Sequence, residues 1–175
     1  MIRIFIDSEP SLRAVEAFSA AAAAAGTACP VWGAFLKIDV GYHRAGVDVT
    51  TPAGEEAGVA LARRLASSAA VEFTGLYSHS GEAYAAATPE EARAIGRAEC
   101  RLALKFKERL VAEGIAVGIV SVGSTPSCAC ADDADGSMFE GATEVRPPAL
   151  AACRHGDPGG GGGGAVWLHG GGAPR

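Results

Sequence analysis

The sequence is poor in lysine and lacks both basic clusters and long apolar runs. Lysine occurs only as Lys37, Lys105 and Lys107, and the 15 basic residues form no block. With 20 acidic residues the formal net charge is −5, so the composition does not favour binding to nucleic acid or to an anionic membrane. No apolar stretch reaches the roughly 20 residues that a membrane-spanning helix requires. We therefore expect no nucleic-acid partner and no membrane span.

Paired cysteines are lacking as well. The five cysteines are odd in number, scattered and preceded by no signal peptide, which favours a reducing, cytoplasmic compartment. Cys128 and Cys130 form a C-x-C pair, but no second pair completes a zinc site. The sequence therefore predicts no metal site.

The remaining composition is that of a folded protein. Hydrophobic residues make up 49% of the 175 positions, and the mean hydropathy is +0.18, which argues against disorder. The composition changes after Pro147, and Gly159 to Gly164 form an unbroken run. We therefore predict one folded segment over residues 1–147 and a low-complexity tail over 148–175 that is disordered or comes from a shifted reading frame.

Strand and helix signals alternate along the folded segment. Short β-branched apolar runs predict strands, while capping residues, first-turn prolines and terminal glycines delimit helices. Thr88-Pro89-Glu90-Glu91, for example, is a capping box with proline in the favoured position. The predicted strands are 2–6, 35–40, 71–77 and 116–121, and the predicted helices are 12–25, 52–67 and 89–113. This alternation indicates repeated βαβ units and a parallel sheet.

The predicted fold class is α/β. About four parallel strands and three helices make half of a (β/α)8 barrel or a small open sheet, and periodicity alone leaves both possibilities open. Both architectures place functional sites at the carboxyl edge of the sheet. The polar loops of this sequence directly follow its predicted strands, which agrees with that position.

Two of these loops contain candidate binding residues. Leu36 to Val47 (L-K-I-D-V-G-Y-H-R-A-G-V) delivers a glycine-flanked basic loop whose backbone could approach a ligand. The alternative is a solvated loop in which Arg44 pairs with a carboxylate. Gly75 to Tyr84 (G-L-Y-S-H-S-G-E-A-Y) places Tyr77 and His79 two residues apart, hence on one side of a continuing strand. The alternative here is a hydrogen-bonded core histidine.

A third loop, Ser121 to Ser127 (S-V-G-S-T-P-S), combines glycine with hydroxyl residues after a strand. Its N–H groups and hydroxyls are suitable donors to a phosphate. Many ordinary turns look alike, and the spacing of a P-loop is absent.

In this order and at these separations, the three motifs resemble the D-serine dehydratase and D-threonine aldolase-like family. These are fold-type III pyridoxal-phosphate (PLP) enzymes whose barrel is similar to that of alanine racemase. The family motifs K-[IL]-D-x-G-x-x-R-x-G, G-[LF]-Y-x-H-x-G-x-x-Y and S-V-G-[SA]-T-P-[ST] occur in the same succession. The resemblance runs from about Phe5 to Pro147, and it implies a partial (β/α)8 barrel with PLP as cofactor.

The resemblance also implies roles for individual residues. Arg44 matches the arginine that reaches the phenolic oxygen of the cofactor, and His79 matches the histidine beside the pyridine ring. Tyr77, with Tyr84 as the second choice, is expected near the ring nitrogen. The residues that match the phosphate-binding turn are Gly123, Ser124 and Thr125.

Two parts of the family pattern are missing. The Schiff-base lysine of the family lies upstream of Met1, and Lys37 sits too early in its strand to replace it. The zinc ligands of the family lie in a C-terminal β domain, beyond Glu144-Val145-Arg146-Pro147, and Cys153-Arg154-His155 has the wrong order and context to replace them. We therefore expect cofactor-binding residues in this chain but neither a catalytic residue nor a metal ligand.

The function implied by the resemblance is that of a PLP-dependent lyase acting on a D-amino acid, with D-serine, converted to pyruvate and ammonia, as the first choice of substrate. The chain is expected to be a fragment that is inactive by itself, and a full-length enzyme is expected to be a homodimer. D-threonine aldolase is one alternative. A non-catalytic PLP-binding or vestigial protein is another.

Overall fold

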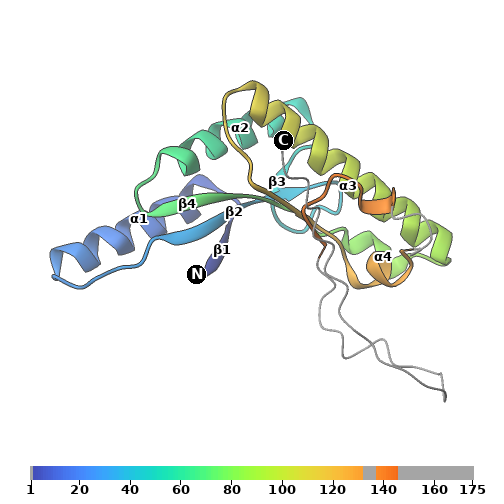
Figure 1. Cartoon of the computed structure of the whole chain (residues 1–175), viewed down its shortest axis with the longest axis horizontal. Helices are drawn as coiled ribbons and strands as arrows, with labels where there is room; N and C mark the ends of the chain where they lie inside the picture. Colours follow the sequence, from blue (N-terminus) through green and yellow to red (C-terminus); the bar gives the residue numbers. More distant parts are fainter. Residues whose placement is uncertain (1, 132–136, 146–175) are drawn as a thin grey trace, which may run out of the picture.

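The predicted alternation of strands and helices is present in the computed structural model, which describes residues 2–131 and 137–145 (Figure 1). The principal elements are β1 Arg3–Ile6, α1 Glu9–Ala24, β2 Trp32–Asp39, α2 Pro52–Ser67, β4 Val71–Tyr77, α3 Pro89–Ala112 and β5 Ile119–Val122. The short elements are β3 Val47–Asp48, the 3₁₀ helix η1 Gly81–Ala85, α4 Thr125–Ala129, the 3₁₀ helix η2 Ser137–Phe139 and β6 Glu144–Val145. The tail predicted over residues 148–175 lies outside the described residues.

The long helices begin where capping residues predict. The side chains of Ser8, Thr51 and Thr88 each accept a hydrogen bond from a backbone N–H three residues further on, and a proline stands in each first turn. Gly26 (φ 68°) and Gly114 (φ 76°) follow the ends of α1 and α3 in the left-handed conformation that favours glycine. Within the described part of the chain, no helix combines the length and the apolar character needed to cross a bilayer.

The strands pair in parallel in the order β1-β2-β4-β5-β6, and β3 pairs with the end of β2. The bounds of β2 and β5 differ from the predicted ones. Strand β2 begins at Trp32 instead of position 35 because it already pairs with β1 at Gly33, and it ends at Asp39 because that side chain binds the following loop. Strand β5 begins at Ile119 instead of position 116 because its pairing with β4 starts opposite Gly75.

One face of the sheet packs against the helices. Alternate strand residues enter a core cluster that also contains residues of all three long helices; it includes Leu36, Leu76, Val120, Leu12, Leu65 and Phe106. In Figure 1, α2 and α3 lie along this face of the twisted sheet. A parallel sheet whose long helices share one face is the arrangement of a segment of a (β/α)8 barrel. The predicted α/β fold class is therefore confirmed.

The other face of the sheet carries the intervening residues of the strands, and we call it the open face. Because side chains alternate along a strand, Phe35 and Lys37 of β2 point away from the core residues that flank them. The ring of Phe5 lies between Phe35 and Tyr77, with centroid separations of 6.0 and 4.3 Å. These rings form an aromatic layer across β1, β2 and β4.

Candidate functional site

Side-chain contacts join the two loops that follow β4 and β5. These strands are parallel neighbours, so both loops leave the same edge of the sheet. The imidazole Nδ1 of His79 lies 3.2 Å from the carbonyl oxygen of Gly123, and the hydroxyl of Tyr84 lies 3.1 Å from Thr125 Oγ1. The rings of His79 and Tyr84 are 6.0 Å apart. An imidazole, a phenol and an aliphatic hydroxyl therefore meet at this edge.

The loop after β2 is shaped by the buried carboxylate of Asp39. Its Oδ1 accepts hydrogen bonds from the N–H groups of Gly41 at 2.9 Å and His43 at 3.1 Å. Gly41 (φ 124°), His43 (φ 55°) and Gly46 (φ 119°) all adopt positive φ values, which reverse the chain direction in a short distance. The loop is thereby held close to the end of its own strand.

A ring packed on a glycine joins this loop to η1. A Cβ atom added to Gly81 would lie 2.0 Å from the ring of Tyr42, so a side chain at position 81 would displace the ring. The guanidinium of Arg44 lies 5.4 Å from the centre of the same ring, within the range of a cation–π contact. Arg44 is thus connected, through Tyr42 and Gly81, to the edge of the sheet at which His79 lies.

The turn after β5 uses one of its predicted donors internally. Ser124 is 0% exposed; its N–H donates to Ser127 Oγ at 3.0 Å, and the two hydroxyls lie 2.9 Å apart. These bonds close the first turn of α4. Thr125 is only partly buried, and its hydroxyl lies beside Tyr84. Of the two hydroxyls predicted for a phosphate, the one of Thr125 is therefore accessible at the edge.

A polar row crosses the open face just inside this edge. Lys37, Tyr77 and Ser121 are direct pairing partners on β2, β4 and β5. The Nζ atom of Lys37 lies 5.0 Å from the centre of the Tyr77 ring. Ser121 Oγ is buried, and among the described residues it has no hydrogen-bond partner, which is uncommon for a buried polar atom. This row therefore contains a partly buried amine and a buried, unsatisfied hydroxyl on the side of the sheet that faces away from the helices.

The amine of Lys37 is perturbed by its surroundings. Burial lowers its pKa below the ordinary 10.5, and the charge of Arg44 lowers it further, while the carboxylates of Asp39, Asp7 and Glu99 act in the opposite direction. A lower pKa increases the neutral, nucleophilic fraction of an amine at a given pH.

The structure brings together most of the residues predicted for the site. The edge cluster contains His79, Tyr84, Gly123 and Thr125, and Arg44 joins it through Tyr42. Tyr77 lies outside this cluster, in the polar row just inside the edge: β4 ends at this residue, so the predicted alternation does not extend to His79, and the ring packs on Phe5.

The sequence left two non-functional interpretations open, an ion pair of Arg44 with a carboxylate and a role of His79 as a core histidine. The structure agrees with them only in part. Among the described residues Arg44 makes no ion pair and lies over Tyr42 instead. His79 is hydrogen-bonded, as a core histidine would be, but it is only partly buried.

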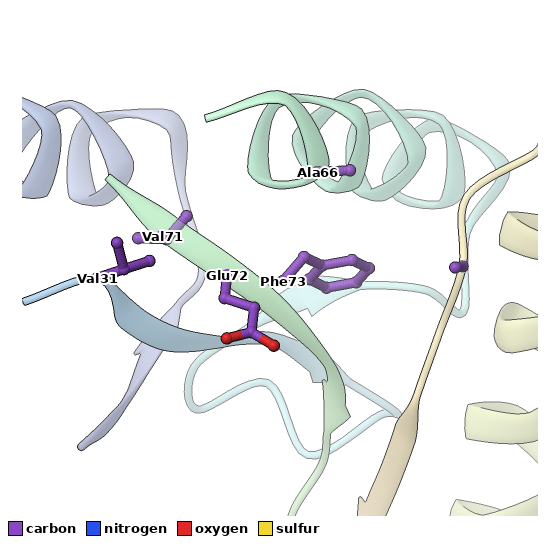
Figure 2. Close-up of a pocket in the computed structure, with 6 residues that line it drawn as sticks. Val31, Ala66, Val71, Glu72 and Phe73 are labelled. Atoms are coloured by element: carbon purple, nitrogen blue, oxygen red, sulfur yellow. The ribbon is translucent and has the colours of Figure 1, made fainter. Parts of the chain in front are cut away.

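A second hollow of the molecule does not fit an anionic ligand, and the described residues offer no metal site. A hollow of about 590 Å³ lies at the amino-terminal ends of β2 and β4, away from the edge cluster (Figure 2); its lining is apolar apart from a carboxylate, and comprises Val31, Ala66, Val71, Glu72, Phe73 and Ala116. No group of three or more His, Cys, Asp or Glu side chains that could hold a metal occurs within residues 2–131 and 137–145.

Sequence reasoning missed three features of the site: the partly buried amine of Lys37, the unsatisfied hydroxyl of Ser121 and the buried carboxylate of Glu99, whose contacts are described below. Strand alternation was a usable signal for Lys37, because its neighbours Leu36 and Ile38 are core residues. Glu99 falls in the apolar stripe of α3, between the buried Gly96 and Ala103, which is an unusual place for a carboxylate.

Comparison with protein families and known proteins gives consistent matches. Residues 2–147 match the model of the alanine racemase N-terminal domain. The chain is 38% identical to a D-serine dehydratase of Dictyostelium discoideum over 97 residues, which are 55% of this chain and 24% of the relative. It is 32% identical to the D-threo-3-hydroxyaspartate dehydratase of Delftia sp. (strain HT23) over 146 residues, which are 83% of this chain and 34% of the relative.

Solved structures match over the same region. The crystal structure of the Delftia dehydratase superimposes with a TM-score of 0.64 at 29% identity, covering 83% of this chain and 34% of the other. A D-threonine aldolase from Filomicrobium marinum superimposes with a TM-score of 0.63 at 23% identity, covering 83% and 35%; at this identity the likeness concerns the fold alone. The chain thus spans between a quarter and about a third of the length of the relatives it matches.

Proposed function

Because the chain belongs to the family of the alanine racemase N-terminal domain, we propose that it forms part of the PLP site of a longer lyase that acts on a D-amino acid. The observation that carries the proposal is the meeting of three strand-end loops at one edge. His79 contacts Gly123, Tyr84 contacts Thr125, and Tyr42 packs on Gly81. In α/β barrels, ligands bind at this carboxyl edge.

The residues at the edge fit the groups of PLP. The phosphate suits the hydroxyls of Thr125 and Tyr84 together with the backbone of the turn at Gly123. The guanidinium of Arg44 suits the phenolic oxygen, since a planar cation pairs well with an anionic oxygen. The buried, unsatisfied hydroxyl of Ser121 would gain a partner from a polar ligand on the open face.

The chain itself binds and orients the cofactor in this proposal. When bound, PLP supplies an electron sink for negative charge at the α-carbon of the substrate. His79 is placed beside the pyridine ring, and Tyr77 approaches the ring nitrogen, with Tyr84 as its alternative. Because Tyr84 already lies against Thr125, we assign it to the phosphate end and retain Tyr77 for the ring nitrogen. No zinc-dependent step is assigned, since the described residues offer no metal-binding group.

The proposed substrate is a D-amino acid with a hydroxyl on its β-carbon, and the proposed reaction eliminates that hydroxyl. Both curated relatives are named as dehydratases. D-serine is the first candidate because the D-serine dehydratase shows the higher identity, 38%. D-threo-3-hydroxyaspartate is the second, because the match to its dehydratase covers 83% of the chain rather than 55%. Retro-aldol cleavage of D-threonine is supported only by the similarity of fold between this chain and a D-threonine aldolase.

The test begins with the isolated chain. Equilibrium titration with PLP, followed by the fluorescence of the added cofactor, should show saturable binding that inorganic phosphate competes with. Reduction with borohydride and mass spectrometry should find no cofactor attached to a lysine, because Lys37 lies inside its strand rather than at the end. A stable adduct on Lys37 would overturn that expectation and make Lys37 the covalent anchor.

The activity is tested on the longer protein encoded by the flanking reading frames. Pyruvate from D-serine but not from L-serine is the expected result. Release of oxaloacetate and ammonia from D-threo-3-hydroxyaspartate alone would select the second candidate, and glycine with acetaldehyde from D-threonine alone would select the aldolase. Tight binding of PLP without any of these activities would select a non-catalytic binding protein.

A further inference from the structure

A carboxylate inside the core is bonded to the loop that carries His79. Glu99 of α3 is only 1% exposed. Its Oε1 accepts hydrogen bonds from Ser78 Oγ at 2.6 Å and from the N–H of Ser80 at 3.2 Å, and its Oε2 accepts one from Ser80 Oγ at 2.6 Å. Ser78 and Ser80 are themselves 0% and 1% exposed. All three donors therefore come from the residues immediately before and after His79.

From this arrangement we propose that Glu99 is a positioning residue for His79. Hydrogen bonds to a charged acceptor are shorter and stronger than neutral ones, and a pair of them on either side of a residue fixes its backbone. The imidazole is then aimed at the carbonyl of Gly123 and at the ring of Tyr84. The inference deepens the proposed function and rests on it in one respect, namely that His79 faces the cofactor.

The same face of α3 also supports the partner loop. A Cβ atom on Gly96, one turn before Glu99, would lie 2.1 Å from Met138 Cε and 3.0 Å from Ser127 Cβ, so the glycine lets both η2 and the turn after β5 approach the helix. Ser127 in turn holds Ser124 through its hydroxyl. Both sides of the His79–Gly123 contact are thus attached to one helix, by a carboxylate on one side and a close approach on the other.

Filling the core does not explain a carboxylate at this position. Among the described residues no basic side chain forms an ion pair with Glu99, so the serine donors alone offset its burial. A buried carboxylate bears a desolvation cost that an apolar residue of similar size avoids. What the carboxylate adds, and leucine would not, is the fixed direction of three hydrogen bonds around His79.

The experiment separates positioning from packing by comparing Glu99→Leu with Glu99→Gln. Leucine fills the space but accepts no hydrogen bond; glutamine keeps one acceptor oxygen and an amide that can donate to Ser80 Oγ, so it should rescue the geometry. Glu108→Leu, on the exposed side of the same helix, is the matched control. The first readout is the ¹⁵N spectrum of the imidazole of His79 in the cofactor-free chain.

A backbone carbonyl can only accept, so the wild-type ring should hold its proton on Nδ1 in a single tautomer. Glu99→Leu should populate both tautomers, while Glu99→Gln and Glu108→Leu retain the wild-type signature. The second readout is the dissociation constant of PLP, which should rise on the order of tenfold in Glu99→Leu and less in Glu99→Gln.

An unchanged His79 signature in a folded Glu99→Leu protein would overturn the proposal. If Glu99→Leu does not fold, Ser80→Ala removes one donor and leaves the carboxylate in place, and the same shift toward mixed tautomers is expected; its absence there would also overturn the proposal. If the wild-type chain binds no PLP, the cofactor role of His79 fails, while the imidazole spectrum still decides whether Glu99 positions it.

Discussion

His79 and Gly123 stand 44 positions apart in the chain, yet the imidazole Nδ1 of one lies 3.2 Å from the carbonyl oxygen of the other. Because that oxygen has no proton to give, the hydrogen bond needs a proton on Nδ1, and in a neutral imidazole Nε2 then keeps its lone pair for a ligand. The contact therefore both joins two loops and fixes which nitrogen of the ring can accept a hydrogen bond.

Removing the donor of this contact should loosen the two loops. In His79→Phe the ring remains but the Gly123 carbonyl loses its partner, so we expect a loss of about 1 kcal/mol in the free energy of unfolding. Binding of PLP should weaken as well. Urea denaturation and cofactor titration measure the two effects. His43→Asn is the control, because asparagine tolerates the positive φ at that position. The prediction would be contradicted if His43→Asn lowered the free energy of unfolding and the affinity for PLP as much as His79→Phe.

Of the two hydroxyls in the turn after β5, that of Ser124 should contribute mainly to stability and that of Thr125 mainly to ligand binding. Ser124→Ala removes a buried capping hydroxyl and should reduce the free energy of unfolding by about 1 kcal/mol. Thr125→Val keeps the shape of a partly exposed side chain, so stability should change little, whereas affinity for PLP and for inorganic phosphate should fall several-fold. Equal losses of affinity in both variants would show that Ser124 also reaches the ligand.

Gly75 should tolerate no side chain. A Cβ atom there would lie 1.9 Å from the carbonyl oxygen of Ile119, and the residue has φ 155°. Because Gly75 and Ile119 are paired residues of neighbouring strands, the backbone has little room to shift, and Gly75→Ala should cost more than about 3 kcal/mol or prevent folding. Gly118→Ala is the matched control, since its Cβ would meet Thr74 O at 3.2 Å and should cost far less. Circular dichroism during urea titration measures both, and similar midpoints for the two variants would refute the expectation.

The lowered pKa of Lys37 should make stability depend on pH in a defined direction. Between the lowered folded value and the ordinary 10.5, the unfolded chain binds more protons at this residue than the folded chain, so the contribution of Lys37 to stability rises with pH across that window. Lys37→Met removes the desolvated charge. We expect it to be more stable than the wild type below the window, by a margin that shrinks as the pH approaches 10.5.

The difference between the two proteins is the quantity to measure, because other groups oppose the trend. Burial raises the pKa of Cys100 and of Cys128 to about 11 from 9.0, so their contribution to stability falls with rising pH between those values. This effect is common to wild type and Lys37→Met and cancels in the comparison. A stability difference that is independent of pH would show that the Lys37 amine titrates as in the unfolded chain.

The order of the principal elements was predictable because their signals are local. Ser8, Thr51 and Thr88 cap their helices through hydrogen bonds to residues three positions on, and such spacing is visible in the sequence. The short elements depend on contacts between distant segments. Strand β6, for example, follows Thr143, whose N–H and hydroxyl both bond to Val120 of β5, and no local signal marks that pairing.

The residues of the candidate site also fall into those with a local sequence signal and those that depend on distant contacts. Arg44, His79 and the turn from Gly123 to Thr125 could be proposed from the sequence because they belong to motifs that follow strands. Glu99 could not be, because its partners lie about 20 residues earlier in the chain. Its place in the apolar stripe of α3 carried the information, but an apolar stripe alone does not identify which loop a buried carboxylate binds.

The contacts of the three loops have a consequence for the width of the site. The segments bearing His79 and Gly123 contact α3 at Glu99 and Gly96, whereas the segment bearing Arg44 is held at the end of β2 by Asp39. The two groups meet where the Tyr42 ring packs on Gly81. The size of the residue at position 81 therefore determines how near the arginine loop lies to the loop of His79, and a larger side chain there would widen the site.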